Sequence, residues 1–227
     1  MLIQIPNLLT PEQVAYARQK LDAANWTDGA ATAGSMAKRV KRNRQIDQAD
    51  PVGRELGQMI LGALMGNSIF ISAAAPLRAL APRFNRYEAG EQYGAHIDSA
   101  IMDAPDSGGL RLRADLSMTV FLSHPEEYDG GELRILANYG NVAVKLPAGH
   151  AVLYSATSLH QVTPVTRGTR TSSFFWIQSM IRDDARRAML FELDQSILSL
   201  RSALPEHPLV DNFTNHFHKL LQQWAET

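Results

Sequence analysis

The middle of this 227-residue chain consists of short apolar or alternating segments separated by turn-forming residues. From Ser68 to Gln178, glycine, proline, asparagine and aspartate interrupt the sequence at short intervals, which indicates antiparallel β structure. Strands are predicted near residues 69–72, 80–87, 95–98, 114–122, 133–136, 142–146, 151–154, 161–165 and 170–180. This spacing favours a double-sheet jelly roll, a fold that can shelter a ligand between its sheets.

Helical patterns flank the β region. Thr10-Pro11-Glu12-Gln13 predicts a helix with a capping box that runs to about Ala24, and Asp50-Pro51 predicts another that ends at Gly66. Beyond Arg182, apolar residues recur three and four apart in two segments separated by prolines. The expected fold class is therefore α+β. We expect an N-terminal helix and strand support over 1–77, a jelly-roll core over 78–180 and a C-terminal helical extension over 181–227.

Composition excludes several classes of partner and site. The net charge is −1, so no overall field favours nucleic acid or an anionic membrane. The chain has no cysteine, and its metal ligands must therefore be nitrogen and oxygen atoms. No stretch approaches the roughly 20 apolar residues of a membrane span, and the N-terminus lacks the features of a signal peptide. We expect a cytoplasmic protein without a nucleic-acid or membrane partner.

A His-x-Asp pair ends the stretch FNRYEAGEQYGAHID. In an extended segment His96 and Asp98 point to the same side, while Ile97 turns away toward apolar surroundings. By its context, His160 is the best third ligand. Two histidines and one carboxylate leave three positions of an iron ion open, as in non-haem Fe(II) oxygenases. No metal role is expected for the remaining histidines, which are His124, His150, His207, His216 and His218.

An arginine follows in a segment with strand periodicity. In TRTSSFFWIQ, alternation places one set of side chains on a single face, namely Arg170, Ser172, Phe174 and Trp176. A buried guanidinium needs a carboxylate partner. A ligand carboxylate could supply it.

The order of these motifs resembles the iron and 2-oxoglutarate-dependent dioxygenases of the prolyl-4-hydroxylase type. The motifs are Arg86-Tyr87, Gly90, Tyr93, His96-x-Asp98, Asp129-Gly130-Gly131-Glu132-Leu133, Pro147-x-Gly149, His160 and Gly168-Thr169-Arg170. The opening MLIQIPNLLT, the central VKRNRQ and the C-terminal helical segments extend this to a resemblance to bacterial PKHD-type hydroxylases. The resemblance implies a double-stranded β-helix and hydroxylation of a substrate, coupled to conversion of 2-oxoglutarate to succinate and CO2.

The resemblance also implies roles for individual residues. Fe(II) would be bound by His96, Asp98 and His160, and no catalytic residue beyond these ligands is expected. 2-Oxoglutarate would chelate the iron, and Arg170 would hold its C5 carboxylate through two parallel hydrogen bonds. Tyr87 either donates a hydrogen bond to the co-substrate or packs on the sheet. L-Ascorbate is expected to sustain turnover.

One departure from the family pattern concerns Phe121. Some prolyl hydroxylases carry a second co-substrate tyrosine at this position, so Arg170 is expected to rely on Thr163 or Ser172 instead. Tyr93, Phe174 and Trp176 are expected to be core residues.

The segment Lys38 to Arg44 holds five basic residues in seven. It either borders the mouth of the site and favours an anionic substrate, or forms solvated surface. The substrate is expected to be a small molecule or a peptide, and the sequence does not indicate the oligomeric state.

Two other functions stay open at this point. The first is a cupin-like metal enzyme, an isomerase or hydrolase without 2-oxoglutarate, against which Arg170 counts. The second is a non-catalytic β-sandwich sensor.

Overall fold

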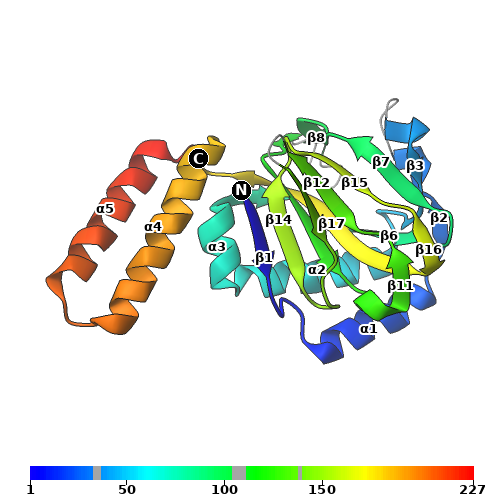
Figure 1. Cartoon of the computed structure of the whole chain (residues 1–227), viewed down its shortest axis with the longest axis horizontal. Coiled ribbons are helices and arrows are strands. Elements are labelled where there is room, and N and C mark those ends of the chain that lie inside the picture. The colour runs from blue at the N-terminus through cyan, green and yellow to red at the C-terminus, as the bar shows by residue number, and fades with distance from the viewer. Residues whose placement is uncertain (33–36, 104–110, 138–139) are drawn as a thin grey trace.

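The computed structural model describes residues 1–32, 37–103, 111–137 and 140–227. In this part of the chain, two antiparallel sheets face each other, helices cover one sheet, and a pair of helices stands beside the core (Figure 1). The predicted jelly-roll α+β fold is confirmed.

The larger sheet combines strands from the N-terminal part of the chain with strands from the β region. The described strands follow the order β1 (Leu2–Ile5), β14 (Ala151–Ser155), β10 (Leu116–Phe121), β17 (Arg170–Ser179), β6 (Arg83–Tyr87), β4 (Arg44–Ile46) and β2 (Trp26–Asp28), with β5 (Pro76–Ala79) also paired to β17.

The smaller sheet carries the opposite wall of the jelly roll. Its described order is β13 (Gly140–Val144), β12 (Leu133–Ala137), β15 (Leu159–Val162), β7 (Gln92–His96) and β3 (Lys41–Arg42). Two short pairs complete the described β structure, β11 (Tyr128–Gly130) with β16 (Val165–Gly168) and β8 (Ile101–Asp103) with β9 (Arg111–Arg113).

Helices α1 (Pro11–Asp22) and α2 (Pro51–Met65) begin and end close to the predicted positions. The capping box of Thr10 and Gln13 is present, and Asp50 caps α2. Alternation in β10 directs Leu116, Met118 and Val120 into the apolar cluster that also contains helical residues. The intervening Ser117 and Thr119 line the cavity between the sheets. Each fully buried large apolar side chain stabilises this layer by about 1.5–3 kcal/mol.

The strand predicted at 69–72 is wrong, because this segment lies within α3 (Ser68–Ala74). The Asn67 side chain caps it by accepting a hydrogen bond from the Phe70 backbone, and Phe70, Ala73 and Ala74 are buried at helical spacing. A short apolar run is compatible with either a strand or a buried helix, so periodicity alone did not separate them.

No single helix among the described residues is long and apolar enough to cross a membrane. Together α2 and α3 meet the criteria of length and composition, but they are bent by 85° relative to each other.

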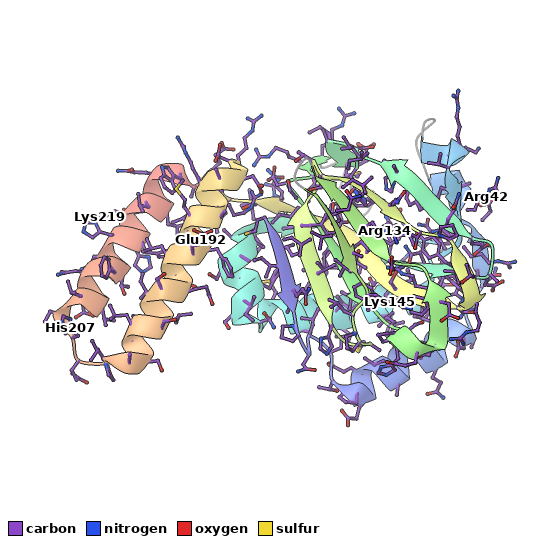
Figure 2. The ribbon with its side chains drawn as sticks, viewed as in Figure 1. Arg42, Arg134, Lys145, Glu192, His207 and Lys219 are labelled. Atoms are coloured by element: carbon purple, nitrogen blue, oxygen red, sulfur yellow. The ribbon has the colours of Figure 1, made fainter. Side chains whose placement is uncertain are left out.

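The predicted C-terminal helices are confirmed as α4 (Asp184–Ala203) and α5 (Pro208–Trp224). They form the orange and red pair at one side of the molecule (Figure 1). The loop that joins them carries His207, which lies at the end of the pair, far from the sheets (Figure 2).

Candidate active site

Paired strands bring the three predicted metal ligands together. His96 ends β7, Asp98 follows two residues later, and His160 lies opposite His96 in the register of β7 and β15. Asp98 Oδ1 is 3.9 Å from His96 Nε2, and Asp98 Oδ2 is 3.8 Å from His160 Nε2. One potential ligand atom from each residue lies within 4.8 Å of the others, the only such group of three or more in the described part of the chain.

Backbone carbonyls orient both imidazole rings. His96 Nδ1 lies 2.8 Å from the Gly94 carbonyl oxygen, and His160 Nδ1 lies 2.9 Å from that of Ser158. Because a carbonyl only accepts, each Nδ1 donates its proton and each Nε2 keeps a lone pair for a metal. Burial, together with the neighbouring His160, lowers the pKa of His96 to about 4. The rings therefore suit a divalent cation.

The carboxylate ligand is also held in place. Ser117 on β10 donates a 2.6 Å hydrogen bond to Asp98 Oδ2. The Tyr93 ring stacks on His96 with centroids 3.6 Å apart, and the Tyr154 ring meets His160 edge-on at 5.1 Å. Two histidines and one carboxylate, each oriented by a neighbour, fit an Fe(II) ion with positions left for reactants.

Arg170 begins β17, and only 1% of its surface is exposed. Its Nη1 donates a 2.7 Å hydrogen bond to Ser172 Oγ, which donates in turn to Asn85 Oδ1 at 2.5 Å. The guanidinium carbon lies 5.4 Å from the ring centroids of Tyr87 and Phe121. Among the described residues Arg170 forms no ion pair, and its Nε has no hydrogen-bond partner. A buried cation among neutral groups fits an anionic ligand.

Tyr87 lies opposite Arg170 in the pairing of β6 with β17. Burial raises the pKa of Tyr87 to about 12, so the phenol stays protonated and can donate a hydrogen bond. It belongs to the apolar cluster between the sheets and also lines the cavity, and both of its expected environments are therefore present.

A cavity of about 130 Å³ connects these groups. Its lining includes all five predicted site residues, which are His96, Asp98, His160, Arg170 and Tyr87. The alternation predicted for β17 is confirmed, because Arg170, Ser172, Phe174 and Trp176 all line it.

Comparison with known proteins identifies the family. Residues 82–178 match the 2OG-Fe(II) oxygenase superfamily, and residues 184–226 match the PKHD-type hydroxylase C-terminal domain. A PKHD-type hydroxylase of Cupriavidus metallidurans is 56% identical over 227 residues, with 100% of both chains covered. The chain belongs to the PKHD-type hydroxylases. It is an Fe(II)- and 2-oxoglutarate-dependent enzyme, and this assignment favours hydroxylation over the cupin-like and sensor alternatives.

Solved structures share the fold of this PKHD-type hydroxylase. A Trichoplax adhaerens prolyl hydroxylase in complex with a hypoxia inducible factor peptide fragment has a TM-score of 0.56 at 14% identity, covering 83% of this chain and 86% of that one. HygX of Streptomyces hygroscopicus, with nickel, 2-oxoglutarate and hygromycin B bound, has a TM-score of 0.52 at 17% identity, covering 78% and 82%.

Several details of the hydroxylase differ from expectation. Ile97 is 57% exposed, so its predicted apolar surroundings were wrong, because β7 ends at His96 and the chain leaves the sheet there. Thr163 accepts a hydrogen bond from the Glu132 backbone and does not line the cavity, whereas Ser172 contacts Arg170 as expected. Tyr93 packs against the core as expected, but it also lines the cavity and stacks on a ligand candidate.

Sequence reasoning assigned no chemistry to Tyr128 in the hydroxylase. This residue is fully buried, and its hydroxyl has no hydrogen-bond partner within the described residues. Burial raises the pKa of Tyr128, while the Arg170 cation lowers it in part. A phenol near Arg170 therefore comes from the start of β11 rather than from position 121, where Phe121 stands. The Pro, Glu and Gly-rich sequence around Tyr128 indicated only a turn and gave no signal of this role.

The basic segment of the hydroxylase divides between two environments. Lys41 is 6% exposed and lines the cavity. Its neighbour Arg42 is exposed, and its side chain points away from the sheets (Figure 2). Alternation along β3 explains the division, because β3 pairs with β7 at the edge of the smaller sheet. The segment therefore contributes one residue to the cavity and another to the solvated surface.

Proposed function

We propose that His96, Asp98 and His160 hold the Fe(II) of this hydroxylase, and that Arg170 and Tyr87 hold 2-oxoglutarate. The observation that carries the proposal is a buried guanidinium that has no carboxylate partner among the described residues and lies in the same cavity as an oriented His-Asp-His group. When bound, the iron and its co-substrate supply the O2 chemistry that hydroxylates a C–H bond and yields succinate and CO2.

The protein's part is to orient these groups. The carbonyls of Gly94 and Ser158 direct both Nε2 lone pairs into the cavity, and Ser117 fixes the carboxylate of Asp98. The rings of Tyr93 and Tyr154 restrict the motion of the imidazoles and limit the access of water. Preorganised ligands need little rearrangement when the metal binds.

Co-substrate recognition would combine charge with hydrogen bonding. The planar guanidinium of Arg170 can meet the C5 carboxylate with two parallel hydrogen bonds. Ser172 and Asn85 hold the guanidinium from one side, and Tyr87 and Tyr128 offer phenols close to it. These groups take the place of the second tyrosine that is absent at Phe121.

An anaerobic titration tests the proposal. Adding 2-oxoglutarate to the Fe(II)-loaded protein should produce the weak visible absorption band of an iron–keto acid chelate. The Arg167→Ala variant is a matched control, because Arg167 lies on the neighbouring β16, is exposed and pairs with Asp129 of β11. It should retain the band, whereas Arg170→Ala should require far more 2-oxoglutarate. If the parent protein gives no band at saturating 2-oxoglutarate, the assigned roles are wrong.

The remaining proposals concern conditions and substrate. L-Ascorbate should sustain activity over many turnovers by keeping the iron reduced, and equal activity without it contradicts this. A cytoplasmic location is the one we propose. The substrate is a small molecule or a peptide, in keeping with related folds that hold hygromycin B or a peptide fragment.

A further inference from the structure

We infer that the substrate carries an anionic group, a carboxylate or a phosphate, which Lys41 and Arg83 bind at the end of the cavity away from Arg170. The inference rests on the proposed function, because it assigns Arg170 to the co-substrate and these two cations to the substrate.

Strand register separates the two cationic ends of the cavity. In the pairing of β6 with β17, Arg170 lies opposite Tyr87 and Phe174 lies opposite Arg83. The two pairs are four residues apart on each strand, which corresponds to about 13 Å at about 3.3 Å per residue. The carboxylate carbons of 2-oxoglutarate are only about 5 Å apart, given four bonds of about 1.5 Å. A co-substrate held by Arg170 therefore leaves the Arg83 end of the cavity for another ligand.

Lys41 reaches this end from the opposite sheet. It pairs with Tyr93 on β7, and its Nζ lies 5.3 Å from the Tyr93 ring centroid and 6.0 Å from that of Phe174. Arg83 lies opposite Phe174, and its guanidinium carbon is 5.2 Å from the Trp176 ring centroid. One cation from each sheet thus converges on the aromatic pair of Phe174 and Trp176.

The positive charges of Lys41 and Arg83 repel each other. Burial and the charge of Arg83 lower the pKa of Lys41 to about 8, although Asp28 and Asp98 act in the opposite direction. Burial also lowers the pKa of Arg83, which forms no ion pair among the described residues. The Gln48 amide oxygen, in the orientation that satisfies both groups, accepts from Arg83 Nη2 at 2.7 Å and holds its guanidinium in place. A bound anion would offset the repulsion between these cations.

The surroundings define the rest of the ligand. Met102 and Phe174 pack against an apolar cluster that contains Trp176, and all three line the cavity. An apolar or aromatic body that ends in the anionic group fits this end of the cavity better than a uniformly polar molecule.

Aromatic anions can test the inference before any substrate is known. Calorimetric titrations would use protein saturated with Mn(II) and 2-oxoglutarate under anaerobic conditions, with benzoate, phenyl phosphate and the neutral benzamide as probes. We expect at least one anion to saturate, and benzamide not to. The better of the two anions indicates whether the group is a carboxylate or a phosphate.

Variants then assign the binding to the two cations. Lys41→Met and Arg83→Met should each weaken the affinity for the anion by about tenfold or more, while the affinity for 2-oxoglutarate stays within about twofold. Arg42→Met, the exposed neighbour on β3, should change neither affinity. Arg83→Lys retains the charge and should recover part of the binding, which covers the case in which a methionine variant does not fold.

The outcomes separate the two proposals. If neither anion binds, if benzamide binds as well as the anions, or if the variants weaken 2-oxoglutarate instead, the inference is overturned. Failure of the parent protein to bind 2-oxoglutarate with Mn(II) would overturn the proposed function itself.

Discussion

Ser117 on the larger sheet donates a 2.6 Å hydrogen bond to Asp98, which follows β7 of the smaller sheet. Ser117 is not itself a ligand candidate, but its hydrogen bond orients Asp98, which is one. Removing the hydrogen-bond partner of a metal ligand typically weakens metal affinity by 10- to 100-fold. We expect Ser117→Ala to weaken Mn(II) binding by about that factor, as measured by electron paramagnetic resonance, without loss of fold.

Ser173→Ala is the matched control for this variant. Ser173 is also buried in the larger sheet, but its hydroxyl makes no hydrogen bond in the described residues. Unchanged Mn(II) affinity in Ser117→Ala would show that Asp98 is oriented without the serine.

The ligand group predicts a stoichiometry of one Fe(II) per chain. Replacing His96, Asp98 or His160 with alanine should abolish binding, because two remaining donors do not hold the ion. Metal analysis after anaerobic gel filtration measures the number of Fe(II) ions bound per chain. His207→Ala, at the far end of the helical pair (Figure 2), should bind as the parent does. Full stoichiometry in His160→Ala would reject the third ligand.

Arg170 should separate co-substrate binding from metal binding. Truncating one member of a desolvated charge pair costs about 2–5 kcal/mol, so Arg170→Ala should weaken 2-oxoglutarate by that amount while Mn(II) still binds. Lysine should restore only part of the affinity, since a point charge does not reproduce the fork of a guanidinium. Anaerobic calorimetry measures the affinity of each variant for 2-oxoglutarate. A 2-oxoglutarate affinity within about twofold of the parent would mean that Arg170 is structural.

Gly168 lies at the end of β16, two residues before Arg170, with φ of +73°. A Cβ there would lie 2.0 Å from the Glu127 carbonyl oxygen. We expect Gly168→Ala to lower the free energy of unfolding by about 1–3 kcal/mol in urea denaturation. Gly62→Ala in α2, where a Cβ meets nothing within 4 Å, should instead stabilise by about 0.5–1 kcal/mol. Equal stability of Gly168→Ala and the parent would contradict the steric argument.

The sequence predicted those site residues whose placement follows from period-2 alternation or from a local motif. Arg170 shares a face of β17 with Ser172, so alternation sufficed for this residue. His96 and Asp98 were found from the His-x-Asp motif itself, because Asp98 lies beyond the end of β7. Ser117 and Arg83 were not assigned, and Lys41 was not distinguished from the rest of its basic segment, because their roles depend on which residues face each other across the two sheets. That information lies in strand order and register, which no local pattern contains. The helix α3 was mistaken for a strand because a short apolar run fits either element.

Because His96 and His160 face each other on neighbouring strands, the stability of the folded enzyme should depend on the supply of iron. On the proposed ligand set, a metal ion joins β7 to β15 in the folded chain only, so occupancy shifts the folding equilibrium by mass action. At a free metal concentration of 100 times the dissociation constant, the folded state gains about 2.7 kcal/mol. For a chain of this size that corresponds to a rise of roughly 5–11 °C in melting temperature. Under iron starvation, the amount of folded enzyme would therefore fall together with its activity.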